Sequence, residues 1–294
     1  MSEQLAEIGR RLRAYRLGKN LTVSRIAESI GVSRAAVYRL EKGELVKIET
    51  LEKISELLDT SLPSLMGVGV EYYSNAVSFF ERMRQLEEDA VHVLGNFSPI
   101  SFLLLSDEYM EHLRTMLIEA IPDSHTDRTA AIDNIDKLLA ILSERRAVAA
   151  ERRTPVVSII SAPDIERFLN AGLIGRFDLG PDVVRARRQA ARREVERLAE
   201  LLVHQPIGVQ VGVVEDTAPS QTFQVFEAND TAAVTLSPYR LGDHPNISAG
   251  IAMVTSTPEA VRLFKATITG QWSRAYKSEA GARILAAALA RAPR

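Results

Sequence analysis

The chain has 294 residues, of which 46% are hydrophobic and 25% are charged, and its formal net charge is −2. This composition is typical of globular proteins and excludes a disordered chain. The absence of cysteine excludes disulfides, thiolate zinc sites and a cysteine nucleophile. At roughly 100–200 residues per domain, the length predicts two domains.

Two sequence features bear on the cellular compartment in which the protein is expected. No apolar run approaches the ~20 residues that are needed to cross a bilayer. The N-terminal residues are charged and periodic, and they lack the apolar core of a signal peptide. We therefore expect a cytoplasmic protein with no membrane contact.

The charge is spread unevenly along the chain. Residues 1–47 hold ten Lys or Arg and five Glu, a local charge of +5, which leaves −7 for the remainder. A basic end on an otherwise acidic protein is typical of a nucleic-acid-binding module. A solvated charged face is the alternative interpretation.

Residues 1–66 predict five short helices with tight connections, and hence a small all-α domain. The first helix covers 3–18. Thr22, Ser33 and Thr50 are suitable N-caps for the next three helices, because their hydroxyl groups accept hydrogen bonds from free backbone N–H groups. A last short turn is expected at 62–65.

The pattern changes after residue 66. A connecting segment is expected over 67–90, with one helix at 71–90 that either pairs with a second copy or packs on its own sheet. Residues 91–294 alternate between apolar, β-rich runs and helical stretches, which predicts a larger α/β domain for sensing and dimerisation. The runs that we expect to form strands are 91–94, 100–105, 156–160, 207–214, 222–226, 232–236 and 247–254. The expected helices cover about 107–120, 127–152, 164–171, 182–204, 258–276 and 278–292.

The segment 21–43, LTVSRIAESIGVSRAAVYRLEKG, is the most informative motif. Small Ala27 allows two helices to cross closely, and Gly31 permits the sharp turn between them. This is the pattern of a helix-turn-helix, whose second helix enters the major groove of DNA. With the trailing pattern RLEKGE…TLEKISELLD, residues 1–66 resemble the Xre/Cro family of repressor domains.

The resemblance implies which side chains meet DNA. Arg34, at the front of the recognition helix, is the candidate for a bidentate contact to guanine, and Ala35 for a thymine methyl group. Val23 occupies a position where the family commonly has a phosphate-binding glutamine, so Thr22 or Ser24 is expected to substitute. The other candidates for base or phosphate contacts are Ser33, Tyr38, Arg39, Lys42, Lys47, Arg10 and Arg13.

The second domain offers weaker signals for a ligand. Loop 239–246 is polar and lies between apolar runs, so Arg240, His244 and Asn246 are candidate ligand contacts, with an ordinary turn as the alternative. Phe97 follows a predicted strand, at a position where ligands often bind. Trp272 is either a pocket wall or a core residue.

A run of arginines between 185 and 197 has glutamates at helical spacing. The spacing predicts a charged solvent face with the pairs Arg192–Glu196, Glu194–Arg197 and Arg197–Glu200. Additional phosphate contact or an anion site is the alternative.

No motif of an enzyme is present. The sequence lacks a phosphate loop, a nucleophile elbow and His-Glu-x-x-His, and its five histidines show no metal-ligand spacing. We expect no catalytic residue, no metal and no cofactor. Residues 207–254 and the stretch VRLFKATITGQWSRA faintly resemble phospholipase-D-like effector domains. The catalytic His-x-Lys motif of those enzymes is missing, so the resemblance implies a binding scaffold.

Together these patterns predict a sequence-specific transcriptional regulator, with repression as the expected direction. It is expected to bind a double-stranded operator as a homodimer, or a higher even oligomer, and to sense a small-molecule effector. The alternatives are an antitoxin-like regulator with a protein partner, and a phospholipase-D-like hydrolase fused to a DNA-binding head.

Overall fold

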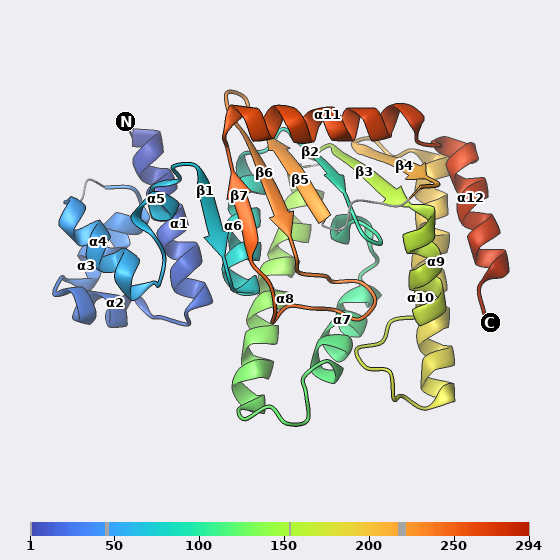
Figure 1. Cartoon of the computed structure of the whole chain (residues 1–294), viewed down its shortest axis with the longest axis horizontal. Helices are drawn as coiled ribbons and strands as arrows, with labels where there is room; N and C mark the ends of the chain where they lie inside the picture. The colour runs from blue at the N-terminus through green and yellow to red at the C-terminus, as the bar shows by residue number, and fades with distance from the viewer. Residues whose placement is uncertain (1, 45–46, 153, 217–221, 294) are drawn as a thin grey trace.

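The computed structural model describes residues 2–44, 47–152, 154–216 and 222–293. Its first part is a small helical domain, the head, and its second part is a mixed sheet with helices on both faces (Figure 1). This arrangement confirms the prediction of an all-α domain followed by a larger α/β domain. The head helices are α1 (Ser2–Gly18), α2 (Val23–Ile30), α3 (Arg34–Glu41), α4 (Ile48–Leu57) and α5 (Leu62–Met66).

Capping residues explain where most of the helices in the head begin and end. Thr22 accepts a hydrogen bond from the backbone N–H of Arg25, and Ser33 accepts one from that of Ala36, both at 3.1 Å. Gly31 ends α2 with a φ of 71°, a left-handed conformation that glycine adopts without strain. The predicted cap at Thr50 is wrong: α4 begins at Ile48, two residues earlier, and Lys47 precedes it without a side-chain cap bond.

The second domain is built on one seven-stranded sheet in the order β1-β7-β6-β5-β2-β3-β4. Strands β2, β3 and β4 pair in parallel, and the remaining neighbours pair antiparallel. The change of direction falls between β2 and β5. The strands are β1 (Val70–Tyr73), β2 (His92–Asn96), β3 (Val156–Ser161), β4 (Val209–Val214), β5 (Thr222–Glu227), β6 (Ala232–Ser237) and β7 (Ala252–Thr255).

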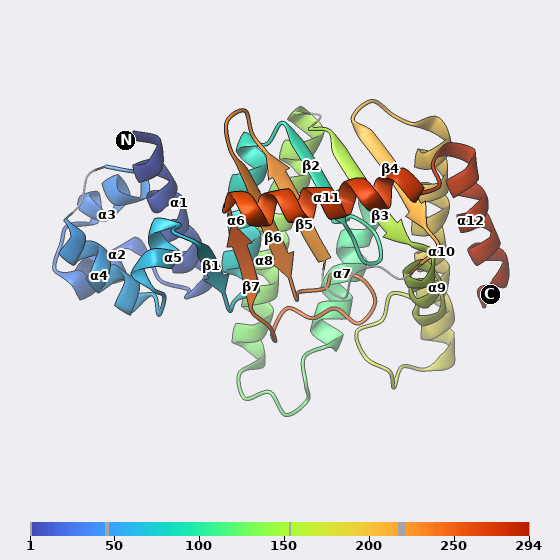
Figure 2. The same cartoon turned by 45° about the horizontal axis from the view of Figure 1, so that its top comes forward.

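Helices cover both faces of the sheet. Figure 2 shows α11 (Pro258–Arg274) crossing one face, and the other helices of this domain lie behind the strands. These are α6 (Ala76–Asp89), α7 (Glu108–Glu119), α8 (Arg128–Arg152), α9 (Ala162–Ala171) and α10 (Pro181–His204), with α12 (Ser278–Arg291) packed against α9, α10 and β4. A separate apolar cluster under α11 contains Phe223, Val225, Val234 and Ile268.

Three predicted elements of this domain are wrong in part. Residues 71–90 are not one helix, because 70–73 form β1 and the helix starts at Ala76. The run 100–105 is a buried loop with a short 3-10 helix, η1 (Phe102–Leu104). Only the end of the run 247–254 is a strand, because β7 covers Ala252–Thr255.

The head and the sheet are joined closely. Strand β1 lies at the edge of the sheet, where free backbone groups invite pairing with other chains. Here the head covers it: the hydroxyl of Tyr15 donates to the carbonyl oxygen of Tyr72 at 3.0 Å, and that of Ser64 donates to Val70 at 3.2 Å. One continuous apolar core runs from the head into the second domain.

Candidate functional site

The exposed face of α3 contains the residues that the sequence predicts for DNA contact. Val37 and Leu40 are buried against the head, and the opposite face of the helix is exposed to solvent. Its exposed residues are Ser33, Arg34, Ala35, Tyr38, Arg39 and Lys42, and Thr22 and Ser24 are exposed at the start of α2. The face is therefore free to meet a partner.

The exposed residues of α2 and α3 differ in the contacts that they already make within the chain. Within the described residues, Arg34 forms no ion pair, whereas Arg39 lies 3.4 Å from a carboxylate oxygen of Glu44. The hydroxyls of Ser33 and Thr22 already serve as helix caps. Of the groups at the start of α3, the backbone N–H groups that the cap leaves free are therefore the ones still able to meet an anion.

The two arginines of α1 that the sequence suggests for phosphate contact lie elsewhere. Arg10 pairs with Glu7 and with Asp89 at the end of α6. Arg13 lies 3.6 Å from the carboxylate of Glu81, also on α6. The structure therefore assigns both to the joint between the head and the second domain.

That joint is centred on Glu71 of β1, which is 4% exposed. Its carboxylate accepts bonds from Arg11 Nε at 2.5 Å, from Arg82 Nε at 3.0 Å and from the hydroxyl of Tyr73 at 2.6 Å. Burial by itself raises the pKa of a carboxyl, but the guanidinium groups of Arg82 and Arg11 and the hydroxyl of Tyr73 hold the pKa of Glu71 below its ordinary value. This ion cluster links α1, β1 and α6.

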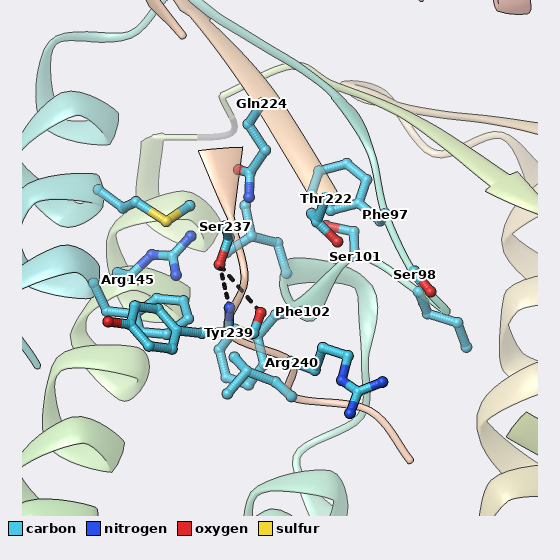
Figure 3. A pocket seen from close by; sticks show the side chains of 15 residues that line it. Phe97, Ser98, Ser101, Phe102, Arg145, Thr222, Gln224, Ser237, Tyr239 and Arg240 are labelled. Atoms are coloured by element: carbon cyan, nitrogen blue, oxygen red, sulfur yellow. Dashed lines mark hydrogen bonds between the residues drawn. The ribbon is translucent and has the colours of Figure 1, made fainter. Parts of the chain in front are cut away.

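Helix α6 also forms one wall of a pocket in the second domain (Figure 3). The pocket lies beyond the end of β2, near the point where the sheet changes from parallel to antiparallel pairing, a usual place for ligands in α/β folds. Its cavity volume is about 50 Å³, and all the space between its walls, including open solvent at the mouth, is about 510 Å³. Its lining residues are Phe80, Met83, Phe97, Ser98, Ile100, Ser101, Phe102, Leu103, Arg145, Thr222, Gln224, Ser237, Tyr239, Arg240 and Leu241.

Helix α6 therefore separates the pocket from the head. Phe80 and Met83 face the pocket. Arg82 donates to Glu7 of α1 at 2.8 Å, and Gln85 donates to the carbonyl oxygen of Arg10 at 3.1 Å. The sequence left open whether this helix pairs with a second copy across a two-fold axis. This side of α6 packs against α1 of its own chain instead.

Of the predicted ligand contacts, Phe97 and Arg240 line this pocket together, and the other three do not line it. Asn246 uses its side chain in its own turn, where it donates to the carbonyl oxygen of Ala249 at 2.7 Å. The ring of His244 stacks on Phe177 at 3.9 Å. Trp272 belongs to α11 and packs on the opposite face of the sheet.

Sequence reasoning missed most of the pocket. Ser101 and Gln224 are isolated polar residues in apolar segments, and Arg145 lies in a long charged helix. Arg145 is 3% exposed, and Glu87 binds its guanidinium at 2.6 and 2.8 Å. The sequence signal that could have indicated these pocket residues is a single polar residue within an apolar run.

The arginine run of α10 is a packing surface rather than a purely solvated face. Arg187 pairs with Glu119 at 3.2 Å, and Arg192 donates to the carbonyl oxygen of Leu289 at 2.8 Å. Glu194 is buried and accepts bonds from Ser106 instead of from Arg197. The glutamate pairs that the spacing predicts do not form among the described residues.

Comparisons with known proteins bear on the head. The family model HTH_3, described as Helix-turn-helix, matches residues 12–65. No curated protein matches the chain. In the described part of the chain, no helix is long and apolar enough to cross a membrane, and no group of three or more His, Asp or Glu side chains is arranged to hold a metal ion. The matched head is a helix-turn-helix DNA-binding domain of the kind that transcriptional regulators carry.

Proposed function

We propose that the chain is a sequence-specific transcriptional regulator, most simply a repressor, that binds its operator through α3. The observation that carries this proposal is the exposed face of α3, on which Arg34 has no ion-pair partner among the described residues. A helix with such a face enters the major groove, where arginine binds guanine O6 and N7. The matched helix-turn-helix model supports the same reading.

The contacts divide into two groups under this proposal. Arg34 and Ala35 read base edges, and Tyr38 contacts a base or a phosphate. Thr22, Ser24, Ser33, Arg39 and Lys42 position the head on the phosphate backbone. Operators for such heads are usually palindromic, so the active form is a homodimer or a higher even oligomer.

The second domain is proposed to sense a small molecule without catalysis. Among the described residues that line the pocket there is no His, Asp, Glu or Lys, the usual general acids and bases. A ligand regulates DNA binding only if it binds two states of the protein differently. Helix α6 is suited to this role, because it contacts both the pocket and α1.

The test uses the full-length protein and a duplex that it selects from a random pool. Fluorescence anisotropy compares the wild type with Arg34→Ala, and Arg283→Ala is the control, since Arg283 is an exposed arginine of α12. We expect Arg34→Ala to weaken binding by roughly 5- to 150-fold, which corresponds to about 1–3 kcal/mol, and to relax the preference at one base pair. Equal affinities for the two variants would contradict the proposal.

A further inference from the structure

The pocket beside α6 has a strongly uneven charge. Its lining residues include Arg145 and Arg240 and, among the described residues, no acidic side chain. Arg145 is neutralised by its bidentate pair with Glu87. Arg240 lies at the rim, is exposed, and forms no ion pair within the described residues (Figure 3). One cationic group is therefore available to a ligand, which favours an anion.

The interior of the pocket holds one polar group that lacks a partner among the described residues. The hydroxyl of Ser101 is fully buried and has no hydrogen-bond partner in the described part of the chain. Gln224 lines the same pocket and adds a side-chain amide to its wall. Buried polar groups in proteins are nearly always hydrogen-bonded, so an unpartnered one beside a cavity indicates a bound molecule with polar atoms.

The rest of the wall is apolar. Phe80, Met83, Phe102 and Leu241 line it, and Phe80 in turn packs against the guanidinium of Arg145 at 5.5 Å. Pockets of this kind bury the body of a ligand in apolar contacts and fix its orientation with a few polar groups. The observed arrangement is thus one charged group at the rim, one unpartnered buried hydroxyl inside, and an apolar wall.

We infer that the pocket binds a small organic carboxylate with an apolar body. The carboxylate pairs with Arg240 at the rim and reaches the hydroxyl of Ser101, and the apolar body lies against Phe80 and Phe102. Guanidinium groups match carboxylates in charge and in planar geometry. This inference deepens the proposed effector role, because it names the class of effector.

The test is isothermal titration calorimetry of the full-length protein with benzoate, phenylacetate and 3-phenylpropionate. The corresponding amides have the same shape without the charge. We expect at least one acid to bind, and its amide to bind at least about tenfold more weakly. Inorganic phosphate is the third probe, and we expect it to bind more weakly than the best acid because it has no apolar body.

Variants locate the site. Arg240→Gln is expected to weaken binding of the best acid about tenfold, and Ser101→Ala several-fold. Arg283→Gln, on α12, is the matched control and should bind as the wild type does. Arg240 is exposed and Ser101 is small, so both variants should keep the wild-type circular dichroism spectrum and melting temperature. If either variant fails to fold, the comparison of acids with amides on the wild type still decides.

The inference is overturned if none of the three acids binds, if the amides bind as tightly as the acids, or if Arg240→Gln leaves the affinity unchanged. Phosphate binding more tightly than every acid would also overturn it. Operator affinity, measured on the same preparation, separates this result from the proposed function. An acid that binds without changing operator affinity leaves the carboxylate site in place and removes the effector role.

Discussion

The ion cluster at Glu71 makes a strong prediction, because it joins the head to the second domain inside the protein. We predict that Glu71→Gln lowers the free energy of unfolding by about 3 kcal/mol, since removing one partner of a buried ion pair costs about 3–5 kcal/mol. The lower end applies because Arg82 keeps its contact with Glu7 at 2.8 Å and Arg11 keeps one at 3.5 Å. The total free energy of unfolding of a typical domain is only about 5–15 kcal/mol, so this loss would be large.

The assay is urea unfolding followed by circular dichroism, combined with hydrogen exchange measured on peptides from α1 and α6. Exchange should rise in both helices, because Arg11 belongs to α1 and Arg82 to α6. Glu279→Gln is the control, since Glu279 is exposed and 3.8 Å from Arg283, and it should leave stability unchanged. A loss below about 1 kcal/mol for Glu71→Gln, or unchanged exchange in α1, would refute the reasoning.

Further predictions concern the pH dependence of Glu71, two glycines of the head and the cap of α6. The pKa of Glu71 is lowered in the folded state, so its contribution to stability is complete above the ordinary value of 4.5 and is lost as the pH falls through the folded value; acid unfolding monitored by circular dichroism should therefore be less steep for Glu71→Gln. Gly67→Ala should destabilise by about 2 kcal/mol or more in urea, because a Cβ there lies 2.3 Å from Arg11 Cζ in a backbone with φ of 71°, and the hydrogen bond to buried Glu71 holds Arg11 in place. Gly31→Ala has the same φ and no atom within 4 Å of the added Cβ, so it should cost only about 1 kcal/mol, and equal losses would contradict the steric argument. Asn75→Ala should cost about 1 kcal/mol, because Asn75 Oδ1 caps α6 by accepting from Val77 N–H at 2.8 Å, and an unchanged midpoint would argue against the cap.

The head could be predicted well because its signals are local. Thr22, Gly31 and Ser33 act on backbone groups within a few residues. Their roles can therefore be predicted from the neighbouring sequence alone. Strand β1 could not be predicted in the same way. It has only four residues, and Glu71 faces inward, where a strand pattern normally has an apolar residue. Its partners Arg11 and Arg82 are supplied by the tertiary fold.

The pocket could not be predicted from the sequence for the same reason, because tertiary contacts assemble it. Phe97 and Arg240 come together because β2 pairs with β5 and β5 with β6, an order that the sequence does not reveal. His244 and Asn246 share a loop with Arg240, yet Asn246 stabilises the turn and His244 stacks on Phe177. The run 100–105 has the apolar character of a strand, but it is a loop that is buried over the pocket.

The proposed function requires that the head recognise a particular DNA sequence. The most direct measurement is the ratio of dissociation constants for the selected duplex and for a scrambled duplex, at a fixed salt concentration near 150 mM. We expect at least about 10³-fold tighter binding to the selected duplex, as is usual for specific regulators. Equal binding to both duplexes, or failure of the full-length protein to enrich any sequence from the random pool, would contradict it.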